Sequence, residues 1–134
     1  MEDFMRTILG LFLTLAAFGC GYSRPKQMTQ AGIVPVVTAI SPVSLNHGGS
    51  DFPLMVRGSN FNGNAVVNWN AAPQSNTTHP MANMLSVMIP AADIATPGTA
   101  QVSVTNPGST PGGPYGGGGN TPSQTSNSMT FTIQ

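Results

Sequence analysis

The stretch DFPLMVRGSNF at residues 51–61 decides the fold class of this chain. Phe52, Leu54 and Val56 occupy alternate positions, so they share one face of an extended strand, whereas Met55 points to the other face. A run with this alternation, followed by Gly and Asn, is typical of a half-buried β-strand. The stretch therefore predicts a strand with one face against a core.

The same alternation recurs along the chain, between clusters of Gly, Pro and Asn. It appears in four further runs, at 65–70, 84–90, 99–107 and 128–134. A run at 34–41 precedes them, and the weaker polar run at 73–79 predicts a short edge strand. No segment has the pattern of an amphipathic helix of three turns. We therefore predict an all-β antiparallel sandwich of about seven strands over residues 34–134.

The inward positions of these runs form the predicted core. They are all apolar or aromatic, and besides Ile40 they are Phe52, Leu54, Val56, Phe61, Val67, Trp69, Leu85, Val87, Ile89, Val102, Val104, Phe131 and Ile133. Trp69 is the largest of them. We expect its indole to pack between the two sheets and to contribute most to the core.

The composition fits a turn-rich domain with little charge. The chain has 134 residues, of which 16 are Gly and 12 are Pro, and only 6% are charged, against about 25% in a typical soluble domain. The formal net charge is zero, and four residues are Lys or Arg. Nucleic-acid binding needs clustered Lys and Arg to displace counterions. The composition therefore excludes nucleic acid as a partner.

The N-terminus has the layout of a secretory signal peptide over residues 1–19. Arg6 precedes an apolar run at 8–18, and the small residue Gly19 follows it. The run would span about 16 Å as a helix, against a hydrocarbon core of roughly 30 Å, so it is too short for a comfortable transmembrane helix. Glu2 and Asp3 interrupt the positive region, and either Met1 or Met5 fits as the start.

Cys20 is the one cysteine of the chain, and it stands directly after this run. The sequence LAAFGC at 15–20 resembles the lipobox of bacterial lipoproteins, although Ala17 stands where that family prefers Leu. The resemblance implies a lipid on Cys20, a membrane anchor, and export to a bacterial cell envelope. The alternative is an ordinary signal peptide followed by a free thiol. Residues 20–33 show no period and predict a flexible tether.

Several segments together resemble the IPT/TIG domain, an immunoglobulin-like module found in plexins, some transcription factors and bacterial surface proteins. The segments span residues 37–133 in the expected order, and they are ISP at 40–42, GGSDFPLMVRGSNF at 48–61, VVNWN at 66–70, MIPAADIATPGTAQVSVTNP at 88–107 and SNSMTFTI at 126–133. The resemblance implies an immunoglobulin-like sandwich that acts as a spacer or binding module. The Gly- and Pro-rich loop at 108–127 is longer than the tight hairpin of many members.

Catalytic and metal sites have little support. His47, Asp51 and either Ser44 or Ser50 are the residue types of a hydrolase triad, but they share one turn, which seldom orients a base against a nucleophile. His79 has no partner at metal-ligand spacing. Calcium needs several carboxylates, and Asp51 and Asp93 alone follow the signal. We expect turn chemistry, no enzymatic activity, no metal and no cofactor.

The candidate binding residues lie in two loops. Tyr115 is surrounded by glycines in the 108–127 loop, where its ring would offer contact area to a sugar or a protein. Asn60, Asn62 and Asn64 form the other loop. In a sandwich of this strand order, both loops lie at the end where the tether enters.

These features predict a non-enzymatic cell-envelope lipoprotein that presents one sandwich domain. Its partners would be the membrane, through Cys20, and a protein or a surface glycan. Backbone groups on the polar edge strand at 73–79 offer a route for strand addition by a partner. The alternatives are a structural spacer or coat module without a specific ligand, and an accessory module of a secreted enzyme.

Overall fold

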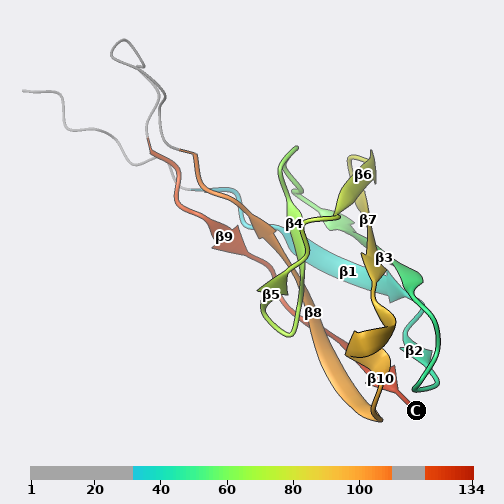
Figure 1. Ribbon diagram of the computed structural model, residues 1–134. Coiled ribbons are helices and arrows are strands. Elements are labelled where there is room, and N and C mark those ends of the chain that lie inside the picture. The colour runs from blue at the N-terminus through green and yellow to red at the C-terminus, as the bar shows by residue number, and fades with distance from the viewer. Residues whose placement is uncertain (1–31, 110–119) are drawn as a thin grey trace, which may run out of the picture.

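The computed structural model describes residues 32–109 and 120–134 as a sandwich of two β-sheets (Figure 1). The four-stranded sheet contains, in order across it, β1 (Val36–Ser41), β3 (Phe52–Ser59), β7 (Met84–Ile89) and β6 (Thr78–Met81). The six-stranded sheet contains β2 (Ser44–Leu45), β10 (Met129–Ile133), β8 (Gly98–Asn106), β4 (Val66–Trp69) and β5 (Ala72–Pro73), with β9 (Gln124–Thr125) paired to β8.

The strand count agrees with the predicted all-β class. Seven strands have four residues or more, and β2, β5 and β9 have two residues each. All pairings are antiparallel except that of β2 with β10. The one helical element of the described residues is the 3₁₀ turn η1 (Ala91–Ile94). The prediction of an antiparallel sandwich is confirmed.

The edge strand predicted at 73–79 is wrong in its boundaries. Pro73 ends β5 in the six-stranded sheet, and Thr78 begins β6 in the four-stranded sheet. Between them, Thr77 N–H and Oγ1 donate to the Gln74 carbonyl at 3.2 and 2.7 Å, which closes a turn. The chain therefore crosses from one sheet to the other within the stretch, because its Ser, Asn and Thr side chains favour turn hydrogen bonds over a strand.

The core lies between the sheets at the alternate positions of the strands. The predicted core residues that are buried are Ile40, Phe52, Leu54, Val56, Val67, Trp69, Leu85, Val87, Ile89, Val102, Val104, Phe131 and Ile133. Phe61 differs from the expectation, because it is only partly buried and packs on the margin of the core. Ile94 is fully buried from η1 and was not among the predicted core residues.

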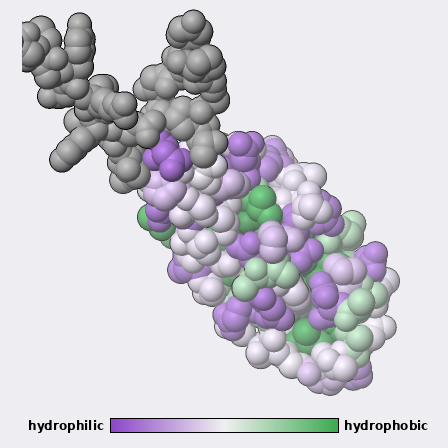
Figure 2. Space-filling model, turned by 60° about the vertical axis from the view of Figure 1, so that its left-hand side comes forward, coloured by the Kyte–Doolittle hydropathy of each residue, from purple (hydrophilic) through white to green (hydrophobic). Residues whose placement is uncertain are grey.

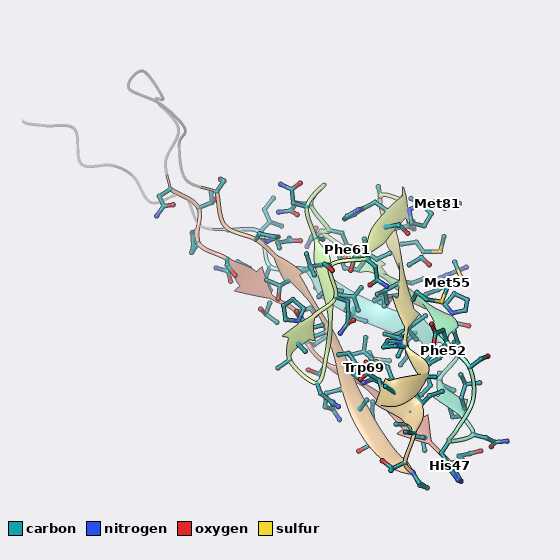
Figure 3. The ribbon with its side chains drawn as sticks, in the orientation of Figure 1. His47, Phe52, Met55, Phe61, Trp69 and Met81 are labelled. Carbon is teal, nitrogen blue, oxygen red and sulfur yellow. The ribbon has the colours of Figure 1, made fainter. Side chains whose placement is uncertain are left out.

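Three aromatic rings from both sheets meet at the centre. The Trp69 ring centroid lies 5.2 Å from that of Phe131 and 6.4 Å from that of Phe52, and the Phe52 ring stacks on Phe131 at 5.4 Å. Trp69 is 4% exposed. Figure 3 shows Trp69 and Phe52 pointing into the space between the sheets. Such edge and offset contacts stabilise aromatic pairs beyond the area they bury.

The two ends of the sandwich are formed by different loops. At one end, His47 N–H donates to the Gln134 carbonyl at 2.7 Å and Gly48 N–H to the Ile94 carbonyl at 2.9 Å. The described N-terminal segment enters at the opposite end, where Asn60 Nδ2 donates to the Val34 carbonyl at 3.3 Å. His47 lies at the first of these ends in Figure 3.

Candidate functional site

Asn106, the last residue of β8, ties three segments together at the N-terminal end of the sandwich. Its Nδ2 donates to the carbonyls of Ile33 at 3.0 Å and Asn60 at 2.7 Å, and its Oδ1 accepts from Asn62 N–H at 3.1 Å. The side chain is 4% exposed. A buried amide with its partners in place is strongly held, because losing any partner would leave a polar group unsatisfied. Asn106 therefore fixes the shape of this end.

The loop with the predicted asparagines is built largely by its own polar groups. Asn60 adopts the left-handed conformation, with φ 61°, which asparagine tolerates better than most residues. Asn62 Oδ1 accepts from Asn64 N–H at 3.0 Å, and Ala65 N–H donates to the Asn62 carbonyl at 3.1 Å. Asn60, Asn62 and Asn64 are all exposed. Some of the polar groups that were expected to bind a ligand therefore form hydrogen bonds within the turn instead.

A cavity of about 350 Å³ opens at this end. It is lined by Gly32, Ile33, Asn60, Phe61, Asn62, Asn106, Pro107, Thr121 and Pro122. Its walls combine apolar groups, including one aromatic ring, with three amides and one hydroxyl, and none of them carries a charge. Its size is near the lower limit of small-ligand pockets. The cavity therefore suits a neutral ligand that offers both apolar and hydrogen-bonding groups.

Close packing of the backbone sets the width of the cavity. A Cβ at Gly32 would lie 2.6 Å from the Pro122 carbonyl oxygen, so a larger residue would push these two walls apart. Ser109 and Thr121 exchange backbone hydrogen bonds of 3.1 and 3.0 Å at the base of the Gly-rich loop. Tyr115, the remaining predicted binding residue, lies outside the described residues. Asn60 and Asn62 line the cavity, whereas Asn64 does not.

The residues that suggested a hydrolase triad serve the opposite end of the domain. His47 Nδ1 lies 2.7 Å from the Gln134 carbonyl oxygen, and Asp51 Oδ1 accepts from Ala91 N–H at 2.8 Å. Each side chain thus contacts the backbone of a different segment. Across the part of the chain that the structure describes, no group of three or more His, Cys, Asp or Glu side chains is placed to hold a metal ion.

The β6 edge of the four-stranded sheet is poorly suited to strand addition. All four residues of β6 are exposed, but Pro80 has no backbone N–H to donate, and the pairing of β6 with β7 shifts register between Thr78 and Met81. These features interrupt the row of backbone groups that a partner strand would need. The N-terminal cavity is therefore the better candidate site.

The predicted signal peptide and lipidation site are not part of the candidate site. The signal at 1–19, Cys20 and most of the tether lie outside the described residues. Within residues 32–109 and 120–134, no helix has the length and apolar character needed to cross a membrane.

Comparison with known families gives one match. A family model described as IPT/TIG domain matches residues 35–133, from just before β1 to the end of β10. No curated protein matches the chain.

Proposed function

The chain belongs to the IPT/TIG domain family, whose members are immunoglobulin-like binding or structural modules, and from this premise we propose that it is a non-enzymatic cell-envelope lipoprotein that binds a neutral surface glycan. The observation that carries the proposal is the uncharged cavity at the N-terminal end. Phe61 supplies a flat apolar surface there, and asparagine side chains supply donors and acceptors. A sugar ring offers the matching groups, because its C–H face is apolar and its edge carries hydroxyls.

At least one polar group of the cavity is free to form a hydrogen bond with a ligand. Asn62 Oδ1 accepts from Asn64 N–H, whereas its Nδ2 has no hydrogen-bond partner among the described residues. Phe61 is partly buried, so one part of its ring packs on the core while another part lines the cavity. A ring held by the core presents a rigid surface, which lowers the entropic cost of binding.

Binding is tested by titrating the full chain with neutral oligosaccharides of glucose, mannose and N-acetylglucosamine while observing backbone amide NMR signals. We expect shifts at Asn62 and Asn106 with at least one of these sugars. Phe61→Leu keeps an apolar contact with the core and removes the ring, so we expect affinity to fall about tenfold, a loss of about 1.4 kcal/mol. Val43→Ala, at an exposed residue outside the cavity, is the matched control.

Two results of this titration contradict glycan binding at the cavity. Either no amide responds to any of the sugars, or Phe61→Leu and Val43→Ala weaken binding equally. The first result favours the second candidate function, a spacer or coat module without a ligand, which family membership also accommodates. An accessory role beside a secreted enzyme would require the ligand to be that enzyme or its polymeric substrate.

The anchoring part of the proposal is supported by the lipobox-like sequence that ends at Cys20. Residues 20–31 of the tether could extend to about 40 Å, and the next two residues, Gly32 and Ile33, line the cavity. A tether of that length allows either end of the sandwich to face away from the membrane. The cavity therefore need not be covered by the membrane.

Anchoring is tested by mass spectrometry of the protein isolated from native membranes, with Cys20→Ala as the comparison. We expect the wild-type N-terminus to be Cys20 carrying acyl chains, and we expect Cys20→Ala to be released from the membrane fraction. A mature N-terminus at another residue, or an unmodified Cys20, contradicts lipidation. Neither result affects the sugar titration, so the two parts of the proposal fail separately.

A further inference from the structure

The turn that follows Phe61 contains the one Asn–Gly dipeptide of the chain, Asn62 with Gly63. Ala65 N–H donates to the Asn62 carbonyl at 3.1 Å, and Asn64 N–H donates to Asn62 Oδ1 at 3.0 Å. Asn62 is thus the first residue of a β-turn, and its side chain folds back over the peptide that follows it. This arrangement brings the side-chain carbonyl carbon of Asn62, Cγ, toward the backbone nitrogen of Gly63.

The Gly63 nitrogen is free to react with that carbon. Its N–H makes no hydrogen bond to any residue that the structure describes, and a Cβ placed on Gly63 would meet no atom within 4 Å. Glycine adds no side chain that would hinder the approach, and its backbone turns easily. The hydrogen bond from Asn64 draws electron density from the Asn62 carboxamide, which makes Cγ more electrophilic. Both partners of an intramolecular attack are therefore in place.

Water reaches this turn, because Asn62, Gly63 and Asn64 are all exposed. Most of the surface visible in Figure 2 is purple or pale, and its green areas are small and separate. None of the described residues that line the cavity beside Asn62 is charged. A hydroxide ion from the solvent is thus the base that removes the Gly63 amide proton.

We propose that Asn62 is a site of spontaneous deamidation, which converts the uncharged cavity into an anionic one. After hydroxide removes the amide proton, the Gly63 nitrogen forms a bond to Asn62 Cγ. The bond from Cγ to the side-chain nitrogen breaks, and that nitrogen leaves as ammonia with a proton from water. A second water molecule then opens the five-membered imide. The net reaction turns one amide and one water into one carboxylate and one ammonium ion, without oxidation or reduction.

The imide opens on either side, and the turn accommodates the two products differently. Breaking the bond from Gly63 N to Cγ restores the backbone and gives aspartate, which can still accept from Asn64 N–H. Breaking the other bond of Gly63 N gives isoaspartate, which inserts one methylene into the main chain. The longer chain cannot keep both the bond from Asn62 N–H to Asn106 and the bond from Ala65 N–H to the Asn62 carbonyl. Isoaspartate therefore loosens this end of the sandwich, whereas aspartate preserves it.

The new carboxylate changes which ligand the cavity favours, a consequence that rests on the proposed glycan site. Asn62 lines the cavity, and its Nδ2 is a donor that no described residue uses. Deamidation replaces this donor with a charged acceptor. A carboxylate forms its strongest hydrogen bonds with cationic donors, so the deamidated cavity favours an amino sugar, whose ammonium group supplies one, over a neutral sugar.

The conversion is tested by incubating the full chain in neutral and in mildly alkaline buffer and mapping its peptides by mass spectrometry over time. We expect Asn62 to deamidate at least about tenfold faster than Asn64, which lies in the same turn but precedes an alanine. The reaction should be faster in alkaline buffer, because base frees the attacking nitrogen. Gly63→Ala fits the turn and should slow the reaction at Asn62. Equal rates at the two asparagines, or no effect of Gly63→Ala, overturn the proposal.

The same measurement in urea shows whether the folded turn reacts as it stands. A reaction that required global unfolding would be slowed by the unfolded fraction, by about a thousandfold or more. Since Asn62 lies in an exposed loop, we expect its rate in the folded chain to stay within about tenfold of the rate in urea. A folded chain in which Asn62 stays intact until the domain unfolds overturns the proposal.

The change of ligand preference is tested with Asn62→Asp, a uniform form of the aspartate product. Oligosaccharides of N-acetylglucosamine and of glucosamine are titrated in mildly acidic buffer, where the glucosamine amine is protonated. We expect the ratio of the two affinities to shift toward glucosamine by about tenfold relative to the wild type. Asn64→Asp is the matched control, because it adds the same charge in the same turn but outside the cavity. Thermal unfolding of both variants shows that each is folded.

The outcomes separate this inference from the proposed function. An equal shift of preference in Asn62→Asp and Asn64→Asp contradicts the effect of the carboxylate on the cavity. A wild-type chain that binds no sugar overturns the proposed glycan site and the change of preference with it. Deamidation of Asn62 is decided by the peptide maps in either case.

Discussion

The side-chain amide of Asn127 pairs with the backbone of Val37 as a neighbouring strand would. Val37 N–H donates to Asn127 Oδ1 at 2.9 Å, and Asn127 Nδ2 donates back to the Val37 carbonyl at 2.9 Å. Val37 belongs to β1, the edge strand of the four-stranded sheet, and Asn127 precedes β10 of the other sheet. One side chain therefore closes part of an open sheet edge and joins the two layers.

Asn127→Ala removes both of these hydrogen bonds. We expect the free energy of unfolding to fall by about 1–3 kcal/mol, because the Val37 backbone groups lose their partner in a partly buried place. The measurement is urea denaturation. Asn83→Ala is the control, since Asn83 is exposed and its side chain makes no hydrogen bond to any described residue. Equal effects of the two substitutions would show that the Asn127 amide contributes nothing particular.

The alternation of apolar residues predicted the inward faces of β3, β4, β7, β8 and β10, because side chains in a regular strand change faces at every residue. It did not predict Val37. The pairing of β1 with β3 shifts register between Val37 and Ala39, so that Val37 and Ile40, three positions apart, both face the core. An irregularity of this kind depends on the partner strand, and β1 alone carries no sign of it.

The candidate site was predictable only in part. Strand order placed the loop of Asn60 and Asn62 at the end where the tether enters, and the structure has them there. Asn106 was missed, although it holds this end together, because its three partners lie far from it in the sequence. The one available signal was an asparagine directly before a proline at the end of an apolar strand. This pattern indicates a turn as readily as a buried side chain that hydrogen-bonds to several segments.

Gly58 occupies a position where no larger residue fits. A Cβ there would lie 1.9 Å from the Val36 carbonyl oxygen and 2.6 Å from the Phe61 ring. We expect Gly58→Ala to lower the free energy of unfolding by about 2–4 kcal/mol, because β1 must move away from β3. Gly63→Ala is the control, since a Cβ at Gly63 meets no atom within 4 Å. The measurement is thermal unfolding of the two variants. Similar unfolding midpoints would contradict the close approach of Gly58 to the Val36 carbonyl oxygen.

The turn between β4 and β5 contains an alanine, Ala71, whose replacement by glycine should stabilise the domain. Asn70 and Ala71 connect the paired residues Trp69 and Ala72, and both have positive φ, 49° and 68°. Two-residue hairpins of this type favour Asn followed by Gly. Alanine in the left-handed conformation costs about 1–2 kcal/mol. Glycine removes this cost, but it also raises the conformational entropy of the unfolded chain, which offsets part of the gain.

Ala71→Gly is therefore expected to stabilise the domain by about 0.5–1 kcal/mol, which calorimetry would record as a rise in the melting temperature. Ala95→Gly is the matched control, because Ala95 is exposed and has a φ of −67°, where alanine is unstrained. We expect that control to lower the melting temperature slightly. A lower melting temperature for Ala71→Gly would mean that the turn does not hold Ala71 in the left-handed region.

Trp69 links the two sheets, because its ring contacts Phe52 of the four-stranded sheet and Phe131 of its own sheet. Trp69→Ala leaves a cavity between the layers, and we expect a loss of about 3–5 kcal/mol. Trp69→Phe keeps an aromatic contact with both neighbours, so it should cost less. Since single domains are stable by only about 5–15 kcal/mol, the alanine variant should be close to unfolding at 37 °C.

The chain has one tryptophan, so fluorescence of the wild-type protein tests the same contact without a substitution. An indole that is 4% exposed should emit at short wavelength and resist quenching by acrylamide, and both properties should change together on urea unfolding. Native emission at the wavelength of free tryptophan would place the ring in water. A ring in water could not join the sheets, and Trp69→Ala would then leave the unfolding midpoint almost unchanged.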